Sequence, residues 1–178
     1  MLPVIQPYSQ DKKLGKAYND AMSWVPNDKW VILMDYDAMF LTPDGIGHVE
    51  EYIRRFPDTG IFTCYTNRLH PMSKGQLWQD RCEDNADIRH HIRIAEEVKK
   101  GLYNVTEIKN PIGGFCMVIK KETWIKHRFS ESLFCLGVDN DFSKRVMAGG
   151  QRVLRMDGVY VFHTYRLMNG YMDKKHLK

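Results

Sequence analysis

The chain has 178 residues, of which 43% are hydrophobic and 27% charged, and its formal net charge is +4. This composition excludes an intrinsically disordered chain, because the apolar side chains suffice to bury a core of ordinary single-domain size. No run approaches the about 18 apolar residues of a membrane-spanning helix, and no signal-peptide core is present. We therefore expect a cytoplasmic domain without a transmembrane segment, for which peripheral membrane association stays open.

The basic residues are scattered among acidic ones, which does not favour nucleic acid as a partner. The four cysteines lack the close spacing of a metal site, and two of them lie in apolar runs. We expect all four to be reduced and mostly buried. They are Cys64, Cys82, Cys116 and Cys135.

Strands alternate with helices in the first third of the predicted structure. Apolar segments at 3–7, 30–34 and 60–65 are typical of strands, and apolar side chains at helical spacing fill 12–25 and about 44–55. Such alternation is characteristic of parallel βαβ units. The sequence therefore predicts an α/β fold with a mixed, mostly parallel central sheet.

A long polar stretch at 66–87 follows, which in a compact domain indicates a lid or a binding loop. Beyond it, the pattern predicts helices at about 85–100, 122–127 and 140–148, and strands at 103–109, 113–120, 152–156 and 159–162. We predict one domain over 1–166 and a polar tail over 167–178.

Two aspartates, Asp35 and Asp37, directly follow the apolar strand at 30–34. Residues two apart in an extended segment share a face, so both carboxylates can bind one Mg²⁺ or Mn²⁺ ion. Ligands of α/β sheets bind at the carboxyl ends of strands, which is where this pair lies. Solvated aspartates also commonly end strands, so the motif alone leaves both interpretations open.

Three further candidates lie late in the chain. Asp139 and Asp141 stand at a predicted helix start, where capping of the helix is the alternative explanation. His163 directly follows the last predicted strand, a place where a lone histidine is more often structural than catalytic.

In their order and spacing, these segments resemble the family-2 glycosyltransferases and the wider GT-A superfamily. The resemblance covers most of the chain, with a shortened N-terminal half. Its motifs are the helix opening Gly15–Asn19, the apolar strand with Asp35 and Asp37, the segment Gly113–Phe115, the segment Val138–Phe142 with Arg145, and His163.

The resemblance implies a GT-A domain that transfers a sugar from a nucleotide-diphosphate donor to a saccharide or other hydroxyl acceptor. Asp37 and His163 would bind Mn²⁺ or Mg²⁺, Asp35 would bind the metal or the donor ribose, and Asp139 would be the general base of an inverting transfer. The residues implied in donor binding are Pro7, Tyr8, Ser9, Gly15, Lys16, Asn19, Asp35, Tyr36, Gly113 and Gly114. Those assigned to the acceptor are Trp78, in the 66–87 loop, and Asp141.

Two other functions stay open at this point. A strand that ends in two aspartates also occurs in haloacid-dehalogenase phosphatases, where Asp35 would be the nucleophile and Asp37 the acid. Met39 stands where that family has threonine or valine. The second open function is a nucleotide-sugar-binding protein with impaired catalysis. Val138, in place of the glutamate usual in the transferases, suggests it.

Overall fold

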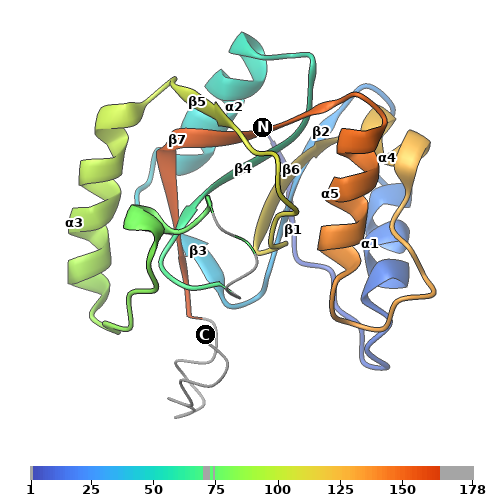
Figure 1. Ribbon diagram of the computed structural model, residues 1–178, viewed down its shortest axis with the longest axis horizontal. Coiled ribbons are helices and arrows are strands. Elements are labelled where there is room, and N and C mark those ends of the chain that lie inside the picture. The colour runs from blue at the N-terminus through green and yellow to red at the C-terminus, as the bar shows by residue number, and fades with distance from the viewer. Residues whose placement is uncertain (1, 70–72, 74, 165–178) are drawn as a thin grey trace.

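The computed structural model describes residues 2–69, 73 and 75–164. Within these ranges the chain forms an α/β domain in which five α-helices surround one mixed sheet of seven strands (Figure 1). The predicted tail at 167–178 lies outside the described residues.

The predicted elements are found with modest shifts of their ends. The strands are β1 (Val4–Ile5), β2 (Trp30–Met34), β3 (Ala38–Phe40), β4 (Thr59–Thr66), β5 (Val105–Glu107), β6 (Cys116–Lys120) and β7 (Arg152–His163). The α-helices are α1 (Leu14–Ser23), α2 (Gly45–Arg55), α3 (Ile88–Val98), α4 (Lys121–His127) and α5 (Val138–Ala148). Short 3₁₀ turns occupy Trp78–Asp80 and Lys99–Gly101, and the two last predicted strands form the single strand β7.

The sheet is largely antiparallel, so the prediction of a mostly parallel sheet is wrong. The strand order is β1-β2-β6-β4-β7-β3, with β5 also paired to β7. Only the pairs β1/β2 and β4/β7 are parallel among the described residues. Strands β2 and β4 do run in the same direction, as the alternating pattern suggested. They are not neighbours, however, because β6 lies between them antiparallel to both.

Both faces of the sheet are covered by helices. On one face, Val49 and Tyr52 of α2 pack on side chains such as Ile32 of β2. The other face carries α1, α4 and α5, which are grouped at one side of the molecule, whereas α3 lies at the opposite side against β7 (Figure 1). Burial on both faces explains why β2 is apolar along its whole length, and it places the strand's carboxyl end at a fixed edge of the core.

Candidate metal centre

Asp35, Asp37 and His163 lie together at one edge of the sheet. Asp35 and Asp37 occupy the turn between β2 and β3, and His163 ends β7, where it pairs with Ala38 of β3. One ligand atom from each of the three lies within 4.8 Å of the others. His163 Nε2 is 3.2 Å from Asp37 Oδ1 and 3.7 Å from Asp35 Oδ2.

The orientation of the His163 ring is set by the chain that follows β4. Its Nδ1 lies 3.0 Å from the backbone oxygen of Arg68, and its backbone N–H donates to Asn67 Oδ1 at 2.8 Å. A carbonyl oxygen only accepts hydrogen bonds, so Nδ1 carries the ring proton. In the neutral ring, Nε2 therefore presents a lone pair to the two carboxylates.

With a neutral imidazole, the two carboxylate oxygens and Nε2 repel one another unless a cation lies among them; with Nε2 protonated, His163 forms an ion pair with the aspartates. Two carboxylate oxygens and one imidazole nitrogen are ligands suited to Mn²⁺ or Mg²⁺, and the bond from Nδ1 to a backbone carbonyl is the usual support for a metal-binding histidine. The predicted ligands therefore fit a divalent cation.

The pKa of Asp35 is raised to about 6, chiefly because burial disfavours its charged form. The charges of Asp37 and Asp139 raise it further, and His163 opposes them. A cation bound here would lower the pKa of Asp35, because a positive charge favours the ionised carboxylate. The Asp35 backbone N–H donates to the Phe115 oxygen at 3.0 Å, and the adjacent Gly114 contacts Asp139, so the predicted base lies near the same edge of the sheet.

Asp139 lies in the first turn of α5, next to the segment before β6. Its Oδ2 accepts the Gly114 N–H at 2.5 Å, and its Oδ1 accepts the Asn140 N–H at 2.9 Å. Burial raises the pKa of Asp139, and these two amide bonds partly offset that effect. A Cβ atom at position 114 would lie 2.9 Å from the Asp139 Cβ, so the contact requires glycine. The predicted base and a predicted donor-binding glycine are thus in direct contact.

The loop after β1 leaves the sheet at the same edge as Asp35 and Asp37. Strand β1 runs parallel to β2 with Ile5 opposite Leu33, so Pro7, Tyr8 and Ser9 follow the carboxyl end of their strand as the aspartates do. Tyr8 is 81% exposed and Tyr36, between the two aspartates, is 85% exposed. These side chains are available to a ligand, and their part in donor binding stays a prediction.

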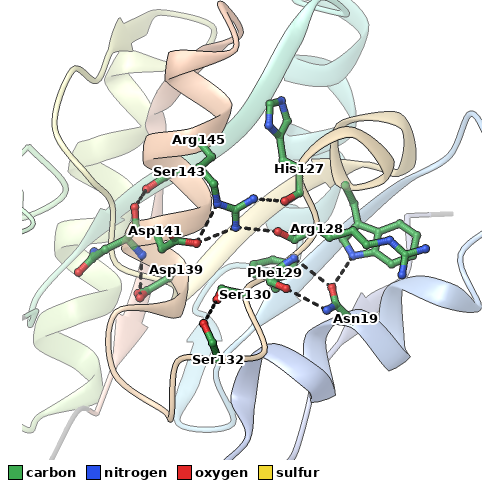
Figure 2. A network of polar contacts seen from close by, with 12 residues as sticks. Asn19, His127, Arg128, Phe129, Ser130, Ser132, Asp139, Asp141, Ser143 and Arg145 are labelled. Carbon is green, nitrogen blue, oxygen red and sulfur yellow. Dashed lines mark hydrogen bonds and ion pairs between the residues drawn. The ribbon is translucent and has the colours of Figure 1, made fainter.

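Asn19 and Gly15 of α1 have a structural explanation (Figure 2). The buried Asn19 amide donates to the Phe129 oxygen and accepts the Phe129 N–H, both at 3.0 Å, and it also accepts the Trp124 indole N–H at 2.8 Å. At Gly15, a Cβ atom would lie 1.9 Å from the Ser130 oxygen. Both residues therefore hold the segment after α4 against α1.

Lys16 and Gly113 complete the predicted donor residues. The exposed Lys16 pairs with Asp20 one turn along α1, at 2.5 Å. Gly113 is bound through both backbone groups by the buried Gln76, whose side chain also donates to Thr63 Oγ1 at 2.6 Å. A donor role for Lys16 and Gly113 stays a prediction.

Asp141, predicted to contact the acceptor, forms a two-bond ion pair with Arg145 at 2.9 and 2.7 Å (Figure 2). The Arg145 guanidinium also donates to the backbone oxygens of His127 and Arg128. The Asp141 carboxylate thus positions an arginine that holds the end of α4. Its acceptor role stays a prediction, as does that of Trp78, which packs edge-on against Tyr65 at 5.0 Å between ring centroids.

Sequence reasoning missed Asn67 and Gln76, and gave no structural role to Arg68. These buried residues of an irregular segment position His163 and Gly113. Isolated polar residues in a loop have no spacing that marks them, so no signal in the chain pointed to them.

No protein-family model matches the chain, and a search of curated proteins finds no relative. Among the residues that the structure describes, no helix is both long and apolar enough to cross a membrane. The functional conclusion therefore depends on the arrangement of residues at the site.

Proposed function

We propose that the protein is a metal-dependent, inverting glycosyltransferase of the GT-A type. It would transfer a sugar from a nucleotide-diphosphate donor to an acceptor hydroxyl. The observation that carries the proposal is the convergence of Asp35, Asp37 and His163, with Asp139 in contact with Gly114, whose neighbour Phe115 binds the Asp35 N–H. A cation site alone would fit many reactions, whereas the neighbouring, partly buried carboxylate of Asp139 adds a candidate base.

Asp35, Asp37 and His163 would hold the Mn²⁺ or Mg²⁺ ion. When bound, the ion supplies positive charge that neutralises the diphosphate leaving group. The exposed side chains of Tyr8 and Tyr36 lie at the edge where the donor would enter.

Asp139 would accept the proton of the acceptor hydroxyl as that oxygen attacks the anomeric carbon. The new bond joins the acceptor oxygen to this carbon, and the bond from the carbon to the diphosphate oxygen breaks. The Gly114 and Asn140 amides fix the Asp139 carboxylate and favour its ionised form, which a base requires. Each Asp139 oxygen retains a lone pair for the proton.

The phosphatase interpretation has less support. The arrangement of His163 beside both aspartates has no part in that reaction. A binding protein without turnover is distinguished from the transferase by the assay below.

The decisive measurement is release of free nucleotide from a panel of nucleotide sugars, with and without Mn²⁺. We expect Mn²⁺-dependent turnover that falls by at least about 100-fold in Asp37→Ala. Asp58→Ala, at an exposed position before β4 and so at the opposite edge of the sheet, is the matched control.

Asp139→Asn tests the base separately. Transfer should fall by about 10²-fold or more while donor affinity is retained, because the amide keeps the shape of the carboxylate but cannot take the proton. Equal loss of donor binding and transfer would contradict this role, and donor binding without turnover by the wild type would contradict the transferase.

A further inference from the structure

A hollow lies beside the candidate metal centre, between α3 and the loop after β4. Its volume is about 170 Å³. Its walls come from the end of β4, the 78–83 segment, α3 and β7, and include Asn67, Trp78, Arg81, Glu83, His90 and Tyr160.

A larger hollow of about 410 Å³ adjoins the first one. The two hollows share Trp78 and Glu97 as lining residues, so these side chains stand at the boundary between them. Beyond Trp78 the larger hollow is lined by residues that include Tyr65, Lys100 and Asp157. We call the two hollows together the Trp78 groove.

Asn67, which lines the smaller hollow, holds a buried hydrogen-bond donor. Its side chain is only 1% exposed, and Oδ1 accepts the His163 backbone N–H at 2.8 Å. That bond fixes the orientation of the amide, because a backbone N–H cannot accept. Among the described residues, Asn67 Nδ2 has no hydrogen-bond partner. A buried donor of this kind is unfavourable unless a ligand oxygen or water satisfies it.

The charged groups of the groove carry both signs. Glu83, Glu97 and Asp157 supply acceptors, and Arg81 and Lys100 supply donors. Such a set suits a neutral molecule with many hydroxyl groups, since each hydroxyl both donates and accepts. Trp78 adds a flat apolar surface, and its edge-on contact with Tyr65 holds the ring in place.

We propose that the Trp78 groove binds consecutive units of a saccharide chain. One unit would occupy the smaller hollow beside Asn67, and the chain would continue past Trp78 into the larger one. That this saccharide is the acceptor rests on the proposed function. The groove would then hold the part of the acceptor that does not react, close to His163 through Asn67.

The test is binding of linear trisaccharides of glucose, N-acetylglucosamine, mannose and galactose, without nucleotide sugar or Mn²⁺. Saturation-transfer NMR detects binding, and calorimetry measures the affinity of the best ligand. We expect Trp78→Ala to weaken it about tenfold, which corresponds to about 1.4 kcal/mol. Glu97→Gln should weaken it as well. Trp24→Ala, at an 87% exposed tryptophan that ends α1, and Glu96→Gln are matched controls that should bind as the wild type does.

Absence of binding by all four trisaccharides at millimolar concentration would overturn the proposal, as would equal losses in Trp24→Ala and Trp78→Ala. Glu97 is exposed, so its variant keeps the test valid if Trp78→Ala does not fold. Asp37→Ala should retain trisaccharide binding. Binding without turnover by the wild type would therefore refute only the transfer reaction, and turnover without binding in the groove would refute only the groove.

Discussion

Single residues at the site each perform more than one task, and Gly114 shows this most directly. Its N–H binds Asp139, and its missing side chain permits the approach of α5. Asn67 similarly binds the His163 backbone while it borders the Trp78 groove. The chemistry of the aspartates and the histidine thus depends on neighbours that do not themselves react.

Gly114→Ala should reduce transfer by at least about tenfold, because the added methyl group displaces Asp139 from its amide partners. Steady-state turnover with saturating donor is the measurement. Gly47→Ala is the matched control, since a Cβ atom there meets nothing within 4 Å. Equal activity of the two variants would show that the Gly114 contact does not position the base.

Between elements, buried or partly buried polar side chains join helices to their neighbours. Arg145 joins α5 to the end of α4, and Asn19 joins α1 to the same segment (Figure 2). On the other side of the molecule, His91 of α3 packs on Phe162 of β7 with ring centroids 4.3 Å apart. These contacts fix the elements that carry Asp139 and His163.

Arg145→Met should lower the free energy of unfolding by about 1–3 kcal/mol, because two backbone oxygens and Asp141 lose their partner. Urea unfolding measures the change. Lys144→Met, at the exposed neighbouring position, should stay within about 0.5 kcal/mol of the wild type. Similar free energies of unfolding for the two variants would rule out a stabilising role for the Arg145 hydrogen bonds.

His91 should make the docking of α3 sensitive to pH. Its Nε2–H donates to the Asn85 oxygen at 2.6 Å, its Nδ1 accepts from the Tyr160 hydroxyl at 2.7 Å, and burial lowers its pKa. The unfolded state, with an ordinary histidine pKa, therefore takes up the proton first. The stability that His91 contributes is present above about pH 6.5 and is lost as the pH falls towards the folded pKa.

Urea midpoints at pH 7.5 and 5.5 measure this effect. His91→Gln should show a smaller loss of stability on acidification than the wild type. An unchanged pH dependence in His91→Gln would contradict the assignment.

At the scale of the whole molecule, the candidate metal centre joins parts of the chain that are remote in sequence. Asp35 and Asp37 lie between β2 and β3, and His163 ends β7, so the site exists only when the sheet has formed. A ligand that binds the native state alone raises the melting temperature.

Mn²⁺ should therefore raise the melting temperature of the wild type in proportion to the logarithm of its concentration. The shift should be absent in Asp37→Ala and retained in Asp58→Ala, measured by differential scanning fluorimetry. A shift of equal size in Asp37→Ala would show that Mn²⁺ binds elsewhere, and no shift in the wild type would refute the metal centre.

Local pattern predicted the helices and most of the strands, because the apolar spacing of a segment reflects the surfaces that it buries, but it did not predict the short strand β3. It also identified Asp35, Asp37 and His163 as residues at strand ends. Strand adjacency was not accessible in this way. The insertion of β6 between β2 and β4, which makes the sheet largely antiparallel, depends on packing among segments that are far apart in sequence.

The tertiary structure also decided which polar residues support the site. Asn67, Arg68 and Gln76 stand in an irregular segment, and their roles arise only from the backbone atoms that folding brings beside them. The resemblance placed Asn19 near the donor and Arg145 in a family motif. In the structure, both bind the segment after α4. Hydrogen bonds between remote residues depend on their distance in space. Spacing along the sequence does not reveal that distance, which is set only when the whole chain has folded.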